Sequence, residues 1–312
     1  MNIILFGAAG FIGKNLVLKL QKNAEDNIIL LDKSKKYFSD IEGNLNKNVV
    51  IKEENLDENS NFDRLLDGQD IVYHLLSTTV PITSNQQIPL ELKANVLFTV
   101  NMLEACVRCG VKKIIFFSSG GTVYGTRAIC PVSEEMPTYP ICSYGLQKIT
   151  IEKLLYLYWH IYNLDYRIIR LSNPYGPYQR PNGILGAVTT FTYKAMKGEK
   201  ITVYGNGSVI RDFIYIDDAV RAISNIVEGE QEYRIFNVGC GYGTSIKKLL
   251  ELIHSILKKD LNIIFKPERK VDVVENFLDI SRYEGVYGKL NPISLQEGIH
   301  RMIVFIEKHY SI

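Results

Sequence analysis

Short apolar runs alternate with longer amphipathic segments along the first half of the chain. Phe11–Lys22 has the 3.6-residue period of a helix, with Leu16, Val17 and Leu20 on one face. The apolar runs, each of strand length, are Asn2–Phe6, Asn27–Leu31, Val49–Lys52, Asp70–Leu75, Lys113–Ser118 and Tyr166–Leu171. Strands separated by helix-length sequence predict βαβ units. We therefore expect a parallel sheet covered by helices on both faces, of the doubly wound α/β class.

The pattern changes after Ser172, where prolines and glycines crowd the segment 174–186 and regular structure is expected to pause. Further helical patterns cover Ala187–Lys197, Asp218–Val227, Ile246–Leu257 and Leu295–His309, and strand-like runs cover Phe213–Ile216 and Ile235–Val238. We expect both of these strands to return to the first sheet. The sequence thus predicts a sheet domain of residues 1–171 with about 213–240, and a smaller α/β lobe of about 172–212 with 241–312.

The balance of charges bears on the possible partners. The 312 residues include 36 Lys and Arg against 34 Asp and Glu, a formal net charge of +2. Such a balance gives neither the basic stripe of a nucleic-acid-binding protein nor a polybasic membrane anchor. No run reaches the roughly 18 apolar residues of a transmembrane helix, and the apolar start lacks a basic signal-peptide region. We expect a cytoplasmic protein that binds neither nucleic acid nor membranes.

The chain has five cysteines, and Cys106-x-x-Cys109 is the one close pair. A redox or zinc site is disfavoured, because no second CxxC and no nearby His pair accompany it. Two small apolar residues on a predicted helix, Val96–Arg108, explain the pair better. Free thiols agree with a reducing compartment.

A glycine-rich turn joins the first predicted strand to the first helix. It contains Gly7, Gly10 and Gly13, with Phe11 and Ile12 between the last two. The glycines allow a tight turn and let backbone N–H groups at the helix N-terminus approach a pyrophosphate. Because the motif lies between a strand and a helix, it indicates a dinucleotide-binding site. The predicted sheet is therefore of the Rossmann type, and the smaller lobe is expected to bind the substrate.

An acidic residue, Asp32, ends the second strand 19 residues after Gly13. Its carboxylate can accept hydrogen bonds from both hydroxyls of an adenosine ribose and would repel a 2′-phosphate. This favours NAD over NADP as the cofactor. The nearby cations Lys33, Lys35 and Lys36 are the counter-evidence.

Tyr144 and Lys148 lie at i and i+4, on one face of a predicted helix start. Tyr193 and Lys197 have the same spacing, but no active-site strand precedes them. Tyr144 follows the strand that ends at Ser118, and open α/β sheets bind ligands at the carboxyl ends of their strands. A nearby lysine and a positively charged nicotinamide would lower the pKa of a tyrosine from about 10 toward neutrality. The pair predicts Tyr144 as a general base, with Lys148 in an electrostatic role.

Taken in order, the motifs resemble those of the extended short-chain dehydrogenase/reductases, in particular the NAD-dependent sugar-nucleotide epimerase/dehydratase group typified by UDP-glucose 4-epimerase. The resemblance spans nearly the whole chain. It rests on the glycine turn, Asp32, His74-Leu75-Leu76, Asn95, Ser118-Ser119-Gly-Gly-Thr-Val-Tyr-Gly125, the Tyr144/Lys148 pair, Arg170-x-x-Asn173-Pro-Tyr-Gly-Pro177, Arg211-Asp-Phe-Ile-Tyr-Ile-Asp-Asp218, Asn237-Val-Gly239 and Leu295-x-x-Gly298. It implies NAD as the cofactor, a nucleotide-diphospho-sugar as the substrate and polysaccharide biosynthesis as the setting.

The resemblance also implies further cofactor contacts. The family's adenine-contacting Asp falls at Asn55, which keeps the acceptor and loses the charge, and Leu56 lies beside it. Asn95 falls where the family uses an Asn to hold the active-site helix, although Phe98 replaces the Gly usual three residues on. The remaining implied cofactor contacts are Lys33, Leu75, Leu76 and Ser118.

The implied substrate contacts lie in the second half of the chain. Asn173, Arg211 and Arg269 match the family's diphosphate-binding residues, and two arginines suit a diphosphate because a guanidinium pairs with phosphate oxygens. Asp272 matches the acid that holds the nucleotide ribose. Tyr204 falls where an aromatic residue packs beside the base.

Four positions bear on the reaction and the sugar. Gly120 stands where the family has a Ser or Thr that hydrogen-bonds the substrate O4, so that Ser119 and Thr122 are the nearest replacements. Gly121 and Thr122 occupy the positions of the catalytic Asp and Glu of the 4,6-dehydratases. Without that acid pair, elimination of water lacks its acid and base, and dehydratase activity is not expected. Asn276 replaces a large Tyr, which favours tolerance of an N-acetyl or other substituent at C2 or C5.

The resemblance implies a 4-epimerase of a nucleotide-diphospho-hexose of the UDP-glucose, UDP-GlcNAc or uronic acid type. One alternative is an NAD(P)H-dependent reductase of an NDP-4-keto-6-deoxy sugar, which Gly120 makes plausible because a one-way reduction needs less help in deprotonating O4. Another is a non-catalytic dinucleotide sensor, which the retention of Tyr144 and Lys148 disfavours. The family commonly dimerises through the helices that hold Asn95 and Tyr144. The aromatic residues Tyr156, Tyr158, Trp159 and Tyr162 cannot all face one side of a helix, so we expect a homodimer.

Overall fold

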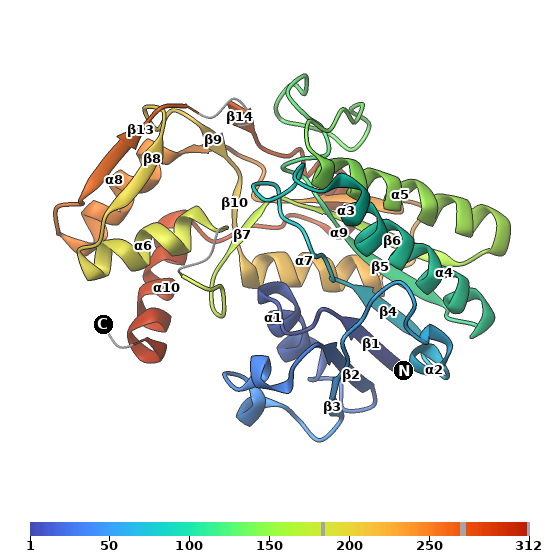
Figure 1. The fold of residues 1–312 in the computed structure, drawn as a ribbon. Helices are drawn as coiled ribbons and strands as arrows, with labels where there is room; N and C mark the ends of the chain where they lie inside the picture. The colour runs from blue at the N-terminus through green and yellow to red at the C-terminus, as the bar shows by residue number, and fades with distance from the viewer. Residues whose placement is uncertain (182–184, 269–272, 311–312) are drawn as a thin grey trace. The chain divides into compact units, whose positions relative to one another are not determined.

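A seven-stranded parallel sheet organises the N-terminal part of the computed structural model, which describes residues 1–181, 185–268 and 273–310 (Figure 1). Its strands are β1 (Asn2–Phe6), β2 (Asn27–Asp32), β3 (Val49–Glu53), β4 (Ile71–His74), β5 (Lys113–Ser119), β6 (Asp165–Leu171) and β11 (Ile235–Val238), in the order β11-β6-β5-β4-β1-β2-β3. β1 pairs in parallel with both β2 and β4, so the strand order reverses beside β1. The predicted doubly wound, Rossmann-type α/β fold is confirmed.

The chain divides into two compact units, here called unit 1 and unit 2. Unit 1 comprises Met1–Val123, Pro140–Arg170 and Ile226–Ile235. Unit 2 comprises Tyr124–Tyr139, Leu171–Asn225 and Phe236–Ile312. The sequence did not indicate that the segment Tyr124–Tyr139 belongs with the second unit.

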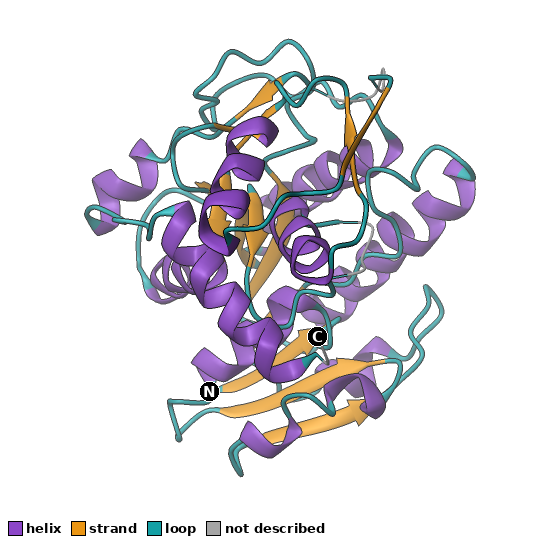
Figure 2. Cartoon of the chain, turned by 90° about the vertical axis from the view of Figure 1, so that its left-hand side faces the viewer, coloured by secondary structure: helices purple, strands orange, loops and turns teal. Residues whose placement is uncertain are grey.

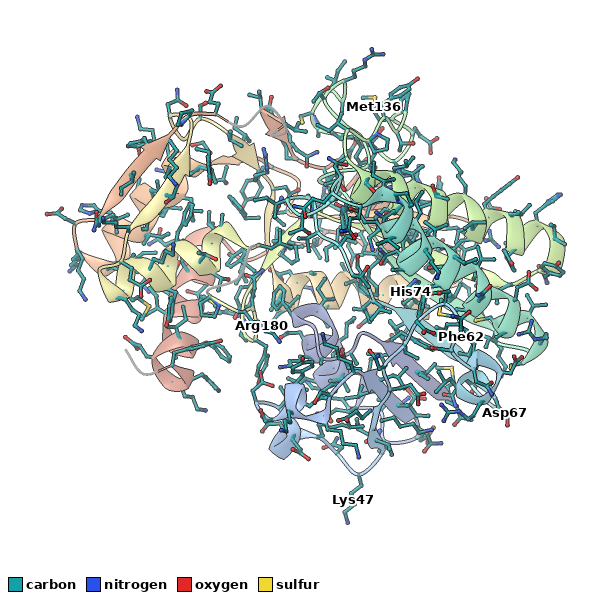
Figure 3. All side chains as sticks on the ribbon, in the orientation of Figure 1. Lys47, Phe62, Asp67, His74, Met136 and Arg180 are labelled. Atoms are coloured by element: carbon teal, nitrogen blue, oxygen red, sulfur yellow. The ribbon has the colours of Figure 1, made fainter. Side chains whose placement is uncertain are left out.

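The helices of unit 1 pack on an apolar core. They are α1 (Phe11–Leu20), α2 (Phe62–Leu66), α3 (Ile88–Leu92), α4 (Phe98–Arg108) and α5 (Ser143–Tyr162), and a π-helical segment, Lys93–Leu97, joins α3 to α4. Figure 1 shows α4 and α5 side by side. In the core, the Phe62 ring meets the Phe98 ring edge-on with centroids 5.0 Å apart, and His74 lies beside Phe98 and Phe116. Phe62 and His74 are labelled in Figure 3. Most of the apolar runs from which the sequence predicts strands therefore contribute residues that are buried between these helices.

Unit 2 contains shorter strands and a second apolar core. Its elements are β7 (Asn173–Tyr175), α6 (Ala187–Lys197), β8 (Ile201–Tyr204), β9 (Ile210–Arg211), β10 (Phe213–Tyr215), most of α7 (Ile216–Glu228), β12 (Thr244–Ser245), α8 (Ile246–Leu257), β13 (Ile263–Lys266), β14 (Glu275–Asn276), α9 (Ser281–Tyr287) and α10 (Leu295–His309). The helices α6, α8 and α10 contact one another around this core, which includes Ile201, Val203, Leu249 and Ile299. Figure 2 shows these strands in orange and helices in purple.

One expectation about the sheet is wrong. β10 pairs with β7 in a separate two-stranded sheet, with Phe213 opposite Asn173, and does not return to the large sheet. The reason is packing, because Phe213 and Tyr215 are buried in the core of unit 2 together with Tyr175. The other strand, Ile235–Val238, does join the large sheet as β11.

Within the described ranges, no helix is both long and apolar enough to span a bilayer. All five cysteines carry free thiols, and Cys106 and Cys240 are buried. Cys106 belongs to the apolar core of unit 1, as expected for a small apolar residue on α4.

Candidate active site

The glycine turn has backbone features that only glycine tolerates. Gly7 has a φ of +78°, and a Cβ there would lie 2.8 Å from the backbone nitrogen of Leu76. A Cβ on Gly13 would lie 2.4 Å from the carbonyl oxygen of Ala8, so this glycine lets α1 approach the turn closely. Gly10 is the N-cap of α1 and provides no side-chain hydrogen bond to the first turn. The N–H groups that begin this ten-residue helix therefore remain suited to an anion.

Asp32 lies beside the glycine turn. Its carboxylate accepts hydrogen bonds from the backbone nitrogens of Ala9 at 3.0 Å and Lys33 at 2.8 Å. The Lys33 ammonium lies over the Tyr37 ring, 5.8 Å from its centroid. A dinucleotide site needs an uncapped helix N-terminus, glycines that let the backbone come close, and a fixed carboxylate. All three are present here, so the residues fit NAD.

The two residues expected near the adenine have different surroundings. Asn55 is exposed, whereas Leu56 is half-buried and packs against the core of unit 1. Leu75 continues from β4, and its backbone nitrogen donates to the carbonyl of Phe6 at 3.0 Å.

Tyr144 and Lys148 both lie on the first turns of α5. The Lys148 ammonium donates to the carbonyl oxygen of Phe117 at 2.8 Å and lies 5.5 Å from the centroid of the Tyr144 ring. Both also line a small recess, together with Leu76, Ser77, Asn95, Gln147 and Ile151. The structure thus brings four of the predicted residues together: Leu76, Asn95, Tyr144 and Lys148.

The pKa values of this pair differ from the sequence-based expectation. Burial raises the pKa of Tyr144 to about 12, with a smaller contribution from Cys142. Burial also lowers the pKa of Lys148 to about 8, against an opposing effect of Glu152. The lysine therefore does not by itself lower the pKa of the phenol. A further positive charge, such as that of an oxidised nicotinamide, is needed to make Tyr144 a base near neutral pH.

The loop after β5 lies against the start of α5. A Cβ on Gly145 would be 2.8 Å from the carbonyl oxygen of Thr122, so glycine next to Tyr144 permits this close approach. The Thr122 hydroxyl is buried and has no hydrogen-bond partner among the described residues. Ser119 ends β5 and is half-buried. Thr122 is therefore a candidate to replace the hydroxyl missing at Gly120.

A buried polar network holds α5; the resemblance indicates Asn95 for this role, but the sequence did not indicate Gln147. The side-chain nitrogen of Asn95 donates to the side-chain oxygen of Gln147 at 2.8 Å. The side-chain oxygen of Asn95 accepts from the Thr78 backbone nitrogen at 2.9 Å. Gln147 in turn donates to the Ser143 hydroxyl at 2.9 Å and to the Glu91 carboxylate at 3.2 Å. Gln147 precedes Lys148 directly, and that adjacency was the one available signal.

A second buried network lies at the end of β5. The Ser118 hydroxyl donates to Glu152 Oε1 at 2.5 Å. Arg170 donates to Glu152 twice, from Nε to Oε1 at 3.1 Å and from Nη2 to Oε2 at 2.6 Å. Ser118, predicted to contact the cofactor, thus has its hydroxyl bonded to Glu152. Glu152 follows Lys148 by one helical turn, a spacing that the sequence shows.

Unit 2 brings two predicted substrate residues together. Arg211 on β9 and Asn276 on β14 are partners in the strand register. Arg211 donates to the carbonyl oxygens of Ile210 at 2.8 Å and Val273 at 2.7 Å. These two hydrogen bonds fix the position of its guanidinium. Asn276 is buried.

The other predicted substrate residues differ in their surroundings. Asn173 on β7 donates from its backbone and side-chain nitrogens to the Asp212 carbonyl, each at 3.0 Å. Tyr204 ends β8 with 37% of its surface exposed. Arg269 and Asp272 lie outside the described residues.

Asp212 is a buried carboxylate that the sequence did not single out. It accepts from the backbone nitrogens of Cys240 at 2.8 Å and Leu278 at 3.2 Å, and burial raises its pKa. A Cβ on Gly239 would meet its carboxylate at 2.3 Å. Asp212 therefore ties the backbone at Cys240 to the backbone at Leu278.

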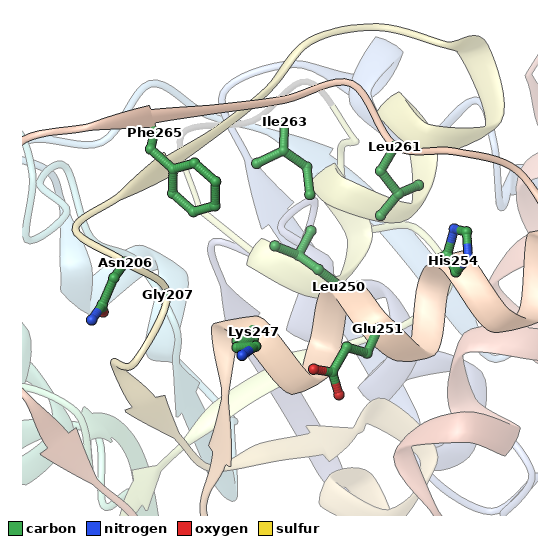
Figure 4. A pocket seen from close by; sticks show the side chains of 9 residues that line it. All are labelled: Asn206, Gly207, Lys247, Leu250, Glu251, His254, Leu261, Ile263 and Phe265. Atoms are coloured by element: carbon green, nitrogen blue, oxygen red, sulfur yellow. The ribbon is translucent and has the colours of Figure 1, made fainter.

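A cavity of about 450 Å³ lies in unit 2 between α8 and β13 (Figure 4). Its lining residues are Asn206, Gly207, Lys247, Leu250, Glu251, His254, Leu261, Ile263 and Phe265. Phe265 is the register partner of the buried Val203, whereas Tyr204 follows Val203 and points to the other face. The cavity is therefore separate from the face that carries Tyr204.

The chain matches the family model described as the NAD dependent epimerase/dehydratase family over residues 3–239. It is 34% identical to a putative UDP-glucose 4-epimerase of Methanocaldococcus jannaschii, over 98% of this chain and 99% of that protein. It is also 32% identical to a dTDP-4-dehydro-6-deoxyglucose reductase of Escherichia coli, over 97% of this chain and 96% of the other.

Among solved structures, the UDP-glucuronic acid 4-epimerase of Bacillus cereus, in complex with UDP-glucuronic acid and NAD, superposes with a TM-score of 0.90. It is 26% identical, and the match covers 99% of this chain and all of that one. The predicted resemblance and the dependence on NAD are thereby confirmed. The chain belongs to the NAD dependent epimerase/dehydratase family.

Proposed function

We propose that this protein is an NAD-dependent 4-epimerase of a nucleotide-diphospho-hexose. The observation that carries the proposal is the position of Tyr144 and Lys148 on one face of α5, beside the end of β5. The glycine turn and Asp32 supply the cofactor site in the same unit. The relatives that are named as UDP-sugar 4-epimerases support this choice of reaction.

In the proposed mechanism, Tyr144 as the phenolate removes the proton from the C4 hydroxyl of the sugar and later returns it. Lys148, with a pKa of about 8, is protonated at neutral pH and stabilises the phenolate. NAD supplies a hydride acceptor for C4 and is not consumed, because the hydride is returned. The Thr122 hydroxyl is proposed to hydrogen-bond O4, with Ser119 as the other candidate.

The proposed cofactor contacts extend along unit 1. They are Gly7, Gly10, Phe11, Ile12, Gly13, Asp32, Lys33, Asn55, Leu56, Leu75, Leu76, Asn95, Ser118, Tyr144 and Lys148. Asp32 is the contact that favours NAD, because its carboxylate would repel a 2′-phosphate.

The nucleotide is proposed to be held by unit 2. Asn173, Arg211 and Arg269 would bind the diphosphate, and Asp272 the ribose. Binding energy concentrated in the nucleotide leaves the 4-keto sugar free to turn about its diphosphate linkage and expose its other face. Tyr204 would pack beside the base, and Asn276 leaves room for a substituent on the sugar.

A second candidate is the reduction of an NDP-4-keto-6-deoxy sugar. Gly120 favours it, because the family hydroxyl that assists deprotonation of O4 is absent. The relative named as a dTDP-4-dehydro-6-deoxyglucose reductase also supports it. Tyr144 and Lys148 would then act as proton donor and electrostatic partner, and the cofactor would exchange in every turnover.

One experiment separates the two candidates. The purified protein is incubated without added cofactor with a panel of UDP-hexoses and UDP-uronic acids, and products are resolved by chromatography and NMR. Stoichiometric bound NAD and a C4 epimer support the epimerase. Consumption of added NADH or NADPH by a 4-keto sugar nucleotide, with no epimer from any hexose, would instead support the reductase.

We also propose that the protein is a homodimer through α4 and α5. On α5, Tyr158 is buried and donates to Glu104 on α4, whereas Tyr156 and Tyr162 are exposed. Leu157 and Ile161 are exposed beside them, at 45% and 56%. An apolar surface on a helix that already packs on α4 is typical of a subunit interface.

The proposed setting is the cytoplasm, where the enzyme would supply precursors for polysaccharide biosynthesis. Five free thiols support a reducing compartment. The near-neutral charge supports a small-molecule substrate rather than nucleic acid or a membrane surface.

A further inference from the structure

The helix face that carries Tyr144 and Lys148 continues to Glu152. The three residues follow one another at intervals of four along α5, so they lie on one side of the helix. Lys148 and Glu152 also reach neighbouring residues of β5, because Lys148 donates to the Phe117 carbonyl and Glu152 accepts from the Ser118 hydroxyl. The ammonium and the carboxylate therefore end in the same part of unit 1.

Glu152 is almost completely buried, with 3% of its surface exposed. A buried carboxylate is costly unless hydrogen bonds and a counter-charge compensate for the loss of water. Here Arg170, itself 4% exposed, donates two hydrogen bonds, and Ser118 donates a third. The orientation of the carboxylate is thus fixed by groups from β5 and β6.

The charges near Lys148 come from several elements. Glu152 and Tyr144 lie on α5, His74 ends β4, and Arg170 lies on β6. Burial lowers the pKa of His74 to about 3, with Lys148 adding to the effect, so His74 is neutral when Lys148 titrates. Glu152 is the group whose charge opposes the loss of the lysine proton.

We propose that Glu152 is a positioning residue for the reaction, and that its buried carboxylate, fixed by Ser118 and Arg170, keeps the Lys148 ammonium charged beside Tyr144. The inference rests on the proposed function, because Lys148 is assigned there. It extends the Tyr–Lys pair to a Tyr–Lys–Glu series on one helix face.

The direct test is a titration of Lys148 in protein labelled with lysine that carries ¹³C at Cε. The Lys148 resonance is assigned with Lys148→Met and followed from pH 6 to 11 in the wild type and in Glu152→Gln. Removing an opposite charge at short range shifts a pKa by roughly one to three units. We expect the Lys148 titration to move to lower pH by about one unit or more.

The kinetic readout is the pH profile of kcat/KM for the sugar nucleotide accepted by the wild type. A lysine that must be charged supports activity below its pKa, and activity is lost as the pH rises through that pKa. In Glu152→Gln the alkaline limb should therefore move to lower pH in parallel with the NMR titration. A purely structural role would lower activity at every pH and leave the limb in place.

Two further variants keep the test decisive. Glu152→Gln leaves Arg170 without its carboxylate, whereas the double variant Glu152→Gln/Arg170→Gln replaces the ion pair by two amides and should fold. Because it removes a positive charge together with the negative one, it should shift the Lys148 titration less than Glu152→Gln does. Asp165→Asn is the matched control, since Asp165 pairs with Arg167 at 2.8 Å at the other end of β6. Asp165→Asn should leave the NMR titration of Lys148 and the pH profile of kcat/KM unchanged.

An unshifted Lys148 titration in a folded Glu152 variant would overturn the inference. The NMR readout needs no substrate, so this outcome is distinct from a failure of the proposed function, in which the wild type would epimerise no sugar nucleotide.

Discussion

At the residue scale, the candidate site combines side chains that the sequence marks with others that it does not. Tyr144 and Lys148 were predictable because their helical spacing and their place after a strand are local features. Gln147 and Glu152 were not, because their partners are distant in the chain: Asn95 is 52 residues before Gln147. The pKa of Tyr144 was also unpredictable, since burial, which raises it, depends on the fold.

The close approach at Gly13 gives a residue-scale prediction. Gly13→Ala places a methyl group 2.4 Å from the Ala8 carbonyl oxygen, so α1 must move away from the turn. We expect the Kd for NAD to rise at least about tenfold, equivalent to about 1.4 kcal/mol. Isothermal titration calorimetry on protein freed of cofactor measures this change.

Gly43→Ala is the matched control, because a Cβ there has no neighbour within 4 Å. Its affinity for NAD should equal that of the wild type. Equal affinities for both variants would show that the turn does not form the cofactor site.

At the element scale, most of the large sheet was predictable and most of unit 2 was not. Central parallel strands are continuous apolar runs, so β1 to β6 stood out within one or two residues of their ends. β9, β12 and β14 have two residues each, and β13 is mostly exposed, so they carry no such signal. The partner of β10 depended on which core buries Phe213, which no local pattern reveals.

The network around Gln147 gives an element-scale prediction. Gln147→Leu removes hydrogen bonds to Asn95, Ser143 and Glu91, and leaves these buried groups without that partner. We expect a loss of about 1–3 kcal/mol in the free energy of unfolding. Since the start of α5 is then less well fixed, kcat should fall roughly 10- to 100-fold with little change in KM.

Denaturant unfolding and steady-state kinetics measure the two effects. Thr150→Ala serves as the control on the same helix, because the Thr150 hydroxyl donates within the helix, to the Leu146 carbonyl at 2.9 Å. A Gln147→Leu enzyme with wild-type kcat would contradict a positioning role for the network.

At the scale of the whole molecule, two features follow from the fold and not from the site. The chain forms two compact units, and Tyr124–Tyr139 belongs to unit 2 together with Leu171–Asn225 and Phe236–Ile312. Unit 1 carries the exposed apolar surface of α5. The sequence predicted an interface there from its aromatic residues, and the exposure of Tyr156 and Tyr162 supports that proposal.

The proposed dimer predicts a mass of about 71 kDa in solution, twice the 35.5 kDa of the chain. Ile161→Glu puts a charge into the exposed apolar surface of α5 and should give a monomer at micromolar concentration, because a buried unpaired charge is costly. Light scattering coupled to gel filtration measures the mass. Val304→Glu on α10, where Val304 is 64% exposed, should leave the dimer intact. A monomeric wild type would refute the proposal.

The most direct test of the central claim uses a UDP-hexose that carries deuterium at C4, incubated in ordinary water without added cofactor. If the protein epimerises by removing and returning the same hydride, NMR will show the C4 epimer with deuterium retained at C4. Tyr144→Phe should give none of it while still binding NAD. An epimer that carries protium at C4, or equal turnover by Tyr144→Phe, would contradict the account.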